Sequence, residues 1–248
     1  GDGLQKSAGD RLREILDRFT SNPFLGVLAG ILVTILIQSS SGTTVLTVAL
    51  VNAGFMTLRQ AIGVIMGANI GTTVTAFIIG LNISEYSLPI IAVGSFLIFF
   101  FNNQKVNNIG QTVFGFGSLF FGLSLMSNGM APLRELKMFH ELTLSMSDNP
   151  ILGVVIGTVF TLIVQSSSAT IGILQGLYAE GAVDLFAALP VLFGDNIGTT
   201  ITAILASLGA SVAARRAAIT HVIFNVIGAT IFLLILGVFT QYVMFLQG

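Results

Sequence analysis

The sequence contains no cysteine, and this excludes disulfide bonds, thiolate metal sites and a cysteine nucleophile. Its two histidines, His140 and His221, are too few for a metal cluster. Only 8% of the 248 residues are charged, whereas a soluble domain carries about 25%. The net charge of −1 gives no basic character that would favour nucleic acid as a partner. Residues 1–20 also lack the short apolar core of a signal peptide.

Hydrophobic residues are abundant instead, at 54% of the chain, with a mean hydropathy of +0.93. Apolar runs of this kind predict helices that cross or enter a membrane, in contact with lipid. We therefore expect an all-α polytopic membrane protein.

One short polar string, Gln-Ser-Ser-Ser, occurs twice inside long apolar runs, at residues 38–41 and 165–168. The apolar run before the first string, residues 24–37, is shorter than the roughly 20 residues that a full span needs. Two short apolar segments around a polar tip predict a re-entrant helical hairpin. Non-helical backbone at that depth survives only where protein or water satisfies its polar groups.

The sequence aligns with itself without gaps when it is shifted by 127 residues. The 60 pairs from 22/149 to 81/208 include 26 identities, and the two polar strings fall on each other. A second motif, Asn-Ile-Gly-Thr-Thr, also falls into register, at residues 69–73 and 196–200. Its glycines and polar side chains interrupt apolar stretches, so we expect a broken membrane helix in each copy. The chain therefore contains two copies of one sequence repeat.

The first repeat is predicted to cover residues 1–127 and the second residues 110–248. The expected segments of the first are the hairpin 22–54, the broken helix 61–80 and the span 88–101. Those of the second are the span 110–130, the hairpin 149–181, the broken helix 187–208 and the span 214–240. Residues 10–19 are amphipathic and suit a helix at the membrane interface. Because the second repeat begins with a span, we expect one more span to precede the first repeat in the natural protein.

The two repeats are predicted to be inverted, because a hairpin returns to the side it left and three crossings then separate the copies. Inverted repeats are typical of secondary transporters, whose sites lie at the repeat interface near the membrane midplane. The basic residues agree with this topology: only Arg134 and Lys137 fall on one side, while the other side carries Lys6, Arg11, Arg13, Arg18, Arg59, Lys105, Arg215 and Arg216. By the positive-inside rule the N-terminal side is cytoplasmic, which predicts a multi-pass protein of the cell inner membrane.

The polar strings carry chemistry suited to ions. Their amide and hydroxyl oxygens are ligands for a hard cation, and the helix that each string opens has free N–H groups that attract an anion. The alternative is that small residues only permit close helix packing. Packing explains Gly26 with Gly30, Gly63 with Gly67, and Gly153 with Gly157, but it does not explain a glutamine at the same depth in both repeats.

Asp195 is the one acidic residue predicted inside the membrane, and its counterpart in the first repeat is Ala68. An intramembrane carboxylate is by default a functional candidate. We expect it to be a sodium ligand or a proton carrier, with a structural ion pair to Arg215 or Arg216 as the alternative.

The paired Gln-Ser-Ser-Ser strings and the Gly-(Ala/Asp)-Asn-Ile-Gly-Thr-Thr strings resemble the type II sodium/phosphate cotransporter family, and most closely its bacterial members. Residues 216–225 (RAAITHVIFN) resemble that family as well. The resemblance implies coupled movement of sodium and inorganic phosphate. Bacterial relatives often continue into a regulatory domain that resembles the phosphate-regulon PhoU protein, and some are linked to phosphate export.

We therefore predict a secondary active transporter that couples sodium to inorganic phosphate by alternating access, without a cofactor. The alternatives are a sodium-independent anion exporter or channel, a different anion such as arsenate or sulfate, and a membrane scaffold or sensor. An enzyme is not expected, since no nucleophile–base constellation is present. A homodimer stays open, as does a PhoU-like domain.

The predicted substrate- and ion-binding residues come from both repeats. They are Gln38, Ser39, Ser40, Ser41, Thr43, Asn69, Thr72, Thr73, Gln165, Ser166, Ser167, Ser168, Asp195, Asn196, Thr199 and Thr200. The predicted sodium ligands among them are Gln38, Ser39, Gln165, Ser166, Asp195 and Thr199.

Overall fold

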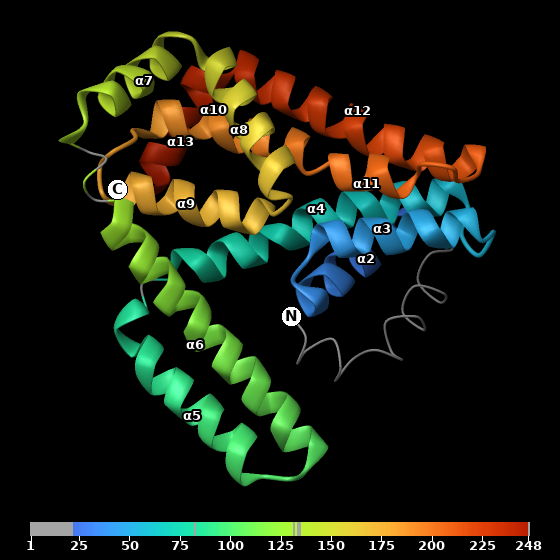
Figure 1. Cartoon of the computed structure of the whole chain (residues 1–248). Helices are drawn as coiled ribbons and strands as arrows, with labels where there is room; N and C mark the ends of the chain where they lie inside the picture. The colour runs from blue at the N-terminus through green and yellow to red at the C-terminus, as the bar shows by residue number, and fades with distance from the viewer. Residues whose placement is uncertain (1–21, 82, 131, 133–134, 248) are drawn as a thin grey trace. The chain divides into compact units, whose positions relative to one another are not determined.

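The computed structural model describes residues 22–81, 83–130, 132 and 135–247. The regular structure of these residues is helical throughout, which confirms the all-α prediction (Figure 1). The chain divides into two units, residues 1–125 with 206–217, and residues 126–205 with 218–248. The interfacial helix expected at residues 10–19 lies outside the described residues.

The first unit contains the hairpin of the first repeat and the helices that follow it. Its elements are α2 (Pro23–Ile37), α3 (Ser40–Asn52), α4 (Leu58–Gly80), the 3-10 helix η1 (Ser84–Tyr86), α5 (Ser87–Phe100) and most of α6 (Gln104–Met130). Asn22 begins α2, since its side chain accepts a hydrogen bond from the N–H of Phe24 at 3.0 Å.

The second unit repeats this order. Its elements are α7 (Lys137–Asp148), α8 (Pro150–Val164), α9 (Ser167–Ala179), α10 (Leu185–Gly198), α11 (Ile201–Ala206), most of α12 (Val212–Leu234) and α13 (Leu236–Gln247). The helical segments 141–148 and 150–164 meet at an angle of 115°. Asn149 begins α8, but its side chain makes no capping hydrogen bond there.

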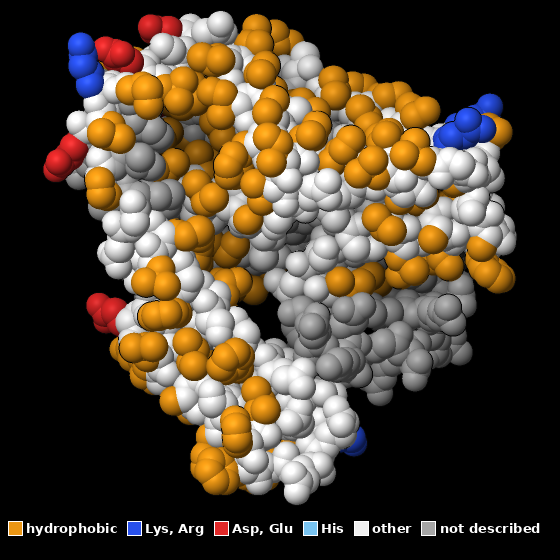
Figure 2. Space-filling view, in the orientation of Figure 1, with side chains coloured by type: hydrophobic (Ala, Val, Ile, Leu, Met, Phe, Trp, Pro, Cys, Tyr) orange, Lys and Arg blue, Asp and Glu red, His pale blue; other side chains and the backbone are white. Residues whose placement is uncertain are grey.

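Four helices of the described residues are long and apolar enough to cross a membrane: Leu58–Gly80, Gln104–Met126, Leu185–Ala206 and Val212–Leu234. The bent pair around Asn149 would make a fifth if it counts as one span, and Ser84–Phe100 is shorter. Figure 2 shows hydrophobic side chains over much of the visible face, with few acidic or basic ones between them. Phe99 and Phe77, for example, are 84% and 70% exposed. Surfaces of this kind contact lipid, and the chain is a membrane protein.

Glycines bring the first half of each hairpin against the long helix of its repeat. A Cβ atom at Gly30 of α2 would lie 2.1 Å from the carbonyl oxygen of Val64 in α4, and one at Gly67 would lie 2.0 Å from that of Val27. The second repeat has the same arrangement between α8 and α10, where a Cβ atom at Gly157 would lie 2.0 Å from the carbonyl oxygen of Val191. Only glycine permits this approach, so the expectation that these glycines serve packing is confirmed.

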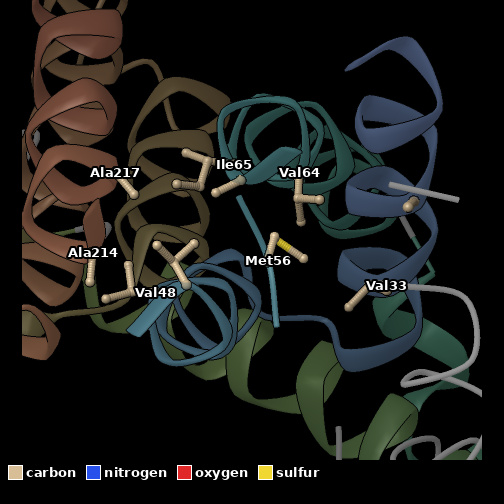
Figure 3. Packing of buried hydrophobic residues seen from close by; sticks show 10 residues of the cluster. Val33, Val48, Met56, Val64, Ile65, Ala214 and Ala217 are labelled. Atoms are coloured by element: carbon tan, nitrogen blue, oxygen red, sulfur yellow. The ribbon is translucent and has the colours of Figure 1, made fainter. Parts of the chain in front are cut away.

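The core of the first unit lies where α2, α3 and α4 pack together (Figure 3). Val33 of α2, Val48 of α3 and Val64 of α4 are at most 1% exposed. Ala214 and Ala217 from the start of α12 complete the cluster. The side chain of Asn52 also accepts a hydrogen bond from the N–H of Ser211 at 2.7 Å, which fixes the end of α3. The hairpin is thus held by packing on two sides.

The predicted break in residues 61–80 is wrong, because α4 is one uninterrupted helix from Leu58 to Gly80. The glycines of the motif are helical and pack against α2. The hydroxyls of Thr72 and Thr73 donate to the carbonyls of Ala68 and Ile70 of the same helix, so they need no break to be satisfied. The counterpart in residues 187–208 is interrupted at Thr199 and Thr200, between α10 and α11.

Two other helix bounds also differ from prediction. The span expected at 110–130 begins earlier, at Gln104, because Asn103 accepts a hydrogen bond from the N–H of Lys105 and so begins the helix. The span expected at 214–240 ends at Leu234, and α13 follows. Its first residue, Leu236, is only 4% exposed and packs in a cluster with Phe193 of α10, which draws α13 onto α10.

Candidate ion-binding sites at the hairpin tips

The first hairpin reverses at two residues. Gln38 ends α2 with φ 58° and ψ 32°, in the left-handed region. Ser39 is extended and begins α3, and its hydroxyl accepts a hydrogen bond from the N–H of Gly42 at 3.0 Å. The tip is therefore a left-handed residue followed by a helix cap.

The second hairpin has the same local geometry. Gln165 ends α8 with φ 55° and ψ 28°, and Ser166 begins α9, accepting from the N–H of Ala169 at 3.3 Å. Gln38 and Gln165 are the non-glycine residues with positive φ in the described part of the chain.

A left-handed conformation costs an L-residue about 1–2 kcal/mol, and glycine would avoid this cost. Glutamine at both tips therefore indicates that its side chain is needed there. In the first tip the amide of Gln38 donates to the carbonyl of Ile35 at 2.6 Å and its oxygen accepts from the hydroxyl of Thr75 at 3.1 Å. Gln38 thus joins the end of α2 to the side of α4. Gln165 is exposed.

Each tip also opens a helix of 13 residues, so it presents free backbone N–H groups and the positive end of a helix dipole. The remaining serines of the strings, Ser40 with Ser41 and Ser167 with Ser168, lie in the first turns of α3 and α9. Backbone N–H groups and hydroxyls together form an environment suited to an oxyanion.

The second unit holds a buried carboxylate beside its tip. Asp195 of α10 is 1% exposed, and its Oδ1 accepts a hydrogen bond from the hydroxyl of Thr161 of α8 at 2.8 Å. The Thr161 and Thr170 hydroxyl oxygens are 2.9 Å apart. Because Thr161 donates its only hydroxyl proton to Asp195, it accepts from Thr170. A relay of two hydroxyls from α9 and α8 therefore ends at the carboxylate.

The first unit carries the same pair of hydroxyls without the acid. Thr34 of α2 donates to Thr43 of α3 at 2.9 Å, and Thr43 donates to the carbonyl of Ser39 at 3.1 Å. Both threonines are at most 1% exposed, as is Ala68, which occupies the position of Asp195. In the second unit Thr170 likewise lies within hydrogen-bonding distance of the tip carbonyl of Ser166, at 3.3 Å, but Thr161 donates to a carboxylate that the first unit lacks. The two tips are therefore chemically different.

The structure places the other predicted residues less uniformly. The hydroxyl of Thr199 lies one turn from the acid, donating to the backbone carbonyl of Asp195 at 2.9 Å, and Thr200 donates to Ile197. Thr73 and Asn196 are exposed and bond to carbonyls of their own helices. The polar interruptions therefore contribute unevenly to the two sites.

Several polar residues of the sites are not in the predicted set. Thr34 and Thr161 lie four residues before the glutamines and are identical in the two repeats. Thr170 is the counterpart of Thr43, and Thr75 matches Thr202 in the same way. Their recurrence at the same positions of both repeats is a signal in the sequence that could have identified these threonines.

No group of three or more histidine, aspartate or glutamate side chains that could hold a metal ion occurs within the described ranges. A cation at these tips would instead rely on oxygens of amides, hydroxyls, carbonyls and Asp195. Ligands of this kind suit a hard monovalent or divalent ion.

Apolar membrane helices with polar hairpin tips and a buried acid are typical of membrane proteins that bind small ions. The chain belongs to the Na+/Pi-cotransporter family: the family's model matches residues 1–128 and matches again over residues 129–246. This is a family of transporters and not of enzymes.

Several curated proteins are similar to the chain. "Uncharacterized protein YqeW" of Bacillus subtilis is 34% identical over 241 residues, covering 97% of this chain and 78% of that protein. "Putative inorganic phosphate export protein YjbB" of Escherichia coli is 30% identical over 233 residues, covering 93% of this chain and 42% of that protein. Human "Sodium-dependent phosphate transport protein 2B" is 52% identical over 61 residues, covering 25% of this chain and 9% of that protein. No solved structure matches.

Proposed function

We propose that the chain forms the transport unit of a sodium-coupled phosphate transporter that works by alternating access. The observation that carries this proposal is the buried carboxylate of Asp195, which is hydrogen-bonded to Thr161 next to a tip that exposes helix N–H groups. The second tip therefore has a carboxylate that could bind a cation close to backbone N–H groups that could bind an anion.

The case for sodium rests on the burial of Asp195. An ionised carboxylate in an apolar interior is strongly unfavourable unless donors or a cation surround it. A hydroxyl relay from Thr170 and Thr161 supplies part of this compensation. A sodium ion held by Asp195, Thr199 and the oxygens of Gln165 and Ser166 would neutralise the remaining charge. Gln38 and Ser39 would offer uncharged ligands in the other repeat.

The case for phosphate rests on the helix starts. The serines and N–H groups at the beginnings of α3 and α9 can donate several hydrogen bonds to an oxyanion. The names of the human and Escherichia coli relatives both refer to phosphate, which supports this anion over sulfate. The family model matches the chain twice, so each matched repeat contains one such helix start.

The same proposal includes the topology. Re-entrant hairpins that enter from opposite faces, in two inverted repeats, would let the tips serve one substrate from either side. The N-terminal side would face the cytoplasm, with Arg59 and Lys105 on that side under the positive-inside rule. The protein would lie in the cell inner membrane.

The test is phosphate uptake into liposomes with sodium, lithium or potassium as the driving gradient. We expect a sodium gradient to drive uptake at least tenfold faster than a potassium gradient. Gln38→Ala together with Gln165→Ala should abolish uptake while the protein still inserts and purifies as a single species. Equal uptake with all three cations would refute the sodium coupling.

A sodium-independent phosphate exporter is the second candidate, because a relative is named as an export protein. It predicts phosphate efflux from loaded vesicles that is unchanged when sodium is replaced by potassium. In that case Asp195 would act without sodium, and Asp195→Ala would leave the cation dependence of transport unchanged.

A further inference from the structure

Two threonines of the helices beside the hairpins, Thr75 and Thr202, are equivalent in the repeat but make different hydrogen bonds. The hydroxyl of Thr75 crosses to the hairpin and donates to the side-chain oxygen of Gln38 at 3.1 Å. The hydroxyl of Thr202 stays within its own segment and donates to the carbonyl of Thr199 at 3.0 Å. The first tip is therefore fastened to its long helix through a contact that differs in the second repeat.

The neighbouring threonines show that this difference is local. Thr72 and its counterpart Thr199 donate to equivalent carbonyls, at 3.1 and 2.9 Å. The next pair, Thr73 and Thr200, also bonds alike, at 2.6 and 2.7 Å. A general divergence of the two repeats would have changed these contacts as well.

The backbone differs at the same place. The helix that carries Thr75 is continuous, whereas the helix of Thr202 is interrupted at Thr199 and Thr200. At the interruption the N–H of Thr200 bonds to the carbonyl of Ile197, three residues back, in place of the usual four. Beyond this interruption the hydroxyl of Thr202 donates to a carbonyl of its own segment. Gln165 is exposed in this setting, while Gln38 is half-buried.

We propose that Thr75 and Thr202 are positioning residues that fasten the tip glutamines alternately. The structure contains both settings, a fastened tip beside a straight helix and a released tip beside an interrupted one. Since the tip glutamines, the two threonines and the Asn-Ile-Gly-Thr-Thr motif are identical in the two repeats, each repeat can adopt either setting, and the opposite state of the cycle has them exchanged. In that state α4 is interrupted at Thr72 and Thr73, and Thr202 holds Gln165. This inference deepens the proposed function and rests on it for the meaning of the cycle.

The chain itself supplies a clean background for the test, because it contains no cysteine. Ile37→Cys and Val164→Cys, each made singly at the residue that directly precedes a tip glutamine, report whether that tip is released. The full chain in liposomes is labelled with a water-soluble maleimide, without sodium and without phosphate. Labelling rates are compared in Thr75→Val and Thr202→Val backgrounds, with Thr230→Val as control, because the hydroxyl of Thr230 bonds only a carbonyl of its own helix.

Thr75→Val removes the hydrogen bond of the fastened first tip, so the cysteine at position 37 should label about threefold to tenfold faster. Thr202→Val removes the corresponding bond of the exchanged state, so the same cysteine should label more slowly by a similar factor. Loss of a threonine's bond to its own helix should matter little, since such bonds contribute almost nothing to helix stability. The cysteine at position 164 should respond with the opposite sign in both backgrounds.

The double variant separates this device from damage to the fold. The two opposite shifts in labelling rate should cancel, so the variant with both Thr75→Val and Thr202→Val should label within about twofold of the parent. If the single variants acted by damaging the fold, their effects on the labelling rate would add in the double variant. Thr75→Ser, which keeps the hydroxyl, should match the parent. Labelling that moves in the same direction in both single variants, or that does not move, would overturn the proposal even if sodium-driven uptake is intact. Absence of uptake with opposite labelling shifts would instead overturn only the proposed function.

Discussion

Asp195→Asn is the sharpest test of the proposed sodium site. Asparagine keeps the size of the side chain and can still accept the hydrogen bond that Thr161 donates at 2.8 Å, so packing between α8 and α10 should survive. What changes is the charge at a position that is 1% exposed. The expected result is a higher sodium concentration for half-maximal phosphate uptake.

The magnitude follows from the charge and its surroundings. Two unit charges 4 Å apart attract by about 4 kcal/mol at an effective dielectric constant of 20. Burial of the carboxylate opposes this gain, because desolvation costs several kcal/mol and is relieved in the variant. A net loss of about 1.5–3 kcal/mol corresponds to roughly a 10- to 100-fold increase in the half-saturating sodium concentration.

The assay is phosphate uptake into proteoliposomes at a series of sodium concentrations with constant ionic strength. Asp148→Asn is the matched control, since Asp148 is exposed at the end of α7 and should leave sodium dependence unchanged. A half-saturating concentration that stays within twofold of the wild type in Asp195→Asn would refute the assignment. Loss of uptake at every sodium concentration, in a protein that is folded by circular dichroism, would point to a proton carrier instead.

Three further predictions each compare two positions of the chain. Gly67→Ala should lower the free energy of unfolding by about 1–3 kcal/mol, because its Cβ would lie 2.0 Å from the carbonyl oxygen of Val27. The control Gly122→Ala should be neutral or stabilising, because a Cβ there meets nothing within 4 Å. Thermal melts in detergent measure both variants. Asn22→Ala should cost about 1 kcal/mol and Asn149→Ala clearly less, because only Asn22 makes a capping hydrogen bond, and equal shifts in melting temperature would contradict this. Ala68→Asp places a carboxylate beside the first hydroxyl pair, so the variant should melt at a lower temperature without sodium and regain more of that loss on sodium addition than the wild type does.

The sequence predicted the features that depend on local composition and on the repeat. The polar strings at residues 38–41 and 165–168 lie where one helix ends and the next begins. The acid at position 195 is buried, as its apolar context indicated. These features follow from short-range rules on helix ends and from the cost of polar groups in apolar runs.

The prediction failed where tertiary contacts decide between two locally similar outcomes. Residues 69–73 and 196–200 have the same sequence, yet only the second segment interrupts a helix. No property of the motif itself could distinguish them, since the glycines pack against α2 and α8 in the same way. The relay from Thr170 through Thr161 to Asp195 was likewise invisible, because it joins three helices whose contacts come from folding.

Asp195, the acid that is buried within the described part of the chain, has an electrical consequence. Asp195 lies near the middle of the candidate span Leu185–Ala206, and the equivalent residue of the other repeat, Ala68, carries no charge. Moving one elementary charge across a membrane changes the free energy by about 2.3 kcal/mol per 100 mV. If Asp195 binds sodium as proposed, its charge would give the empty and the sodium-loaded protein different responses to voltage. Under the proposed function the membrane potential would act on this site through Asp195, and its polarity would favour one direction of the cycle.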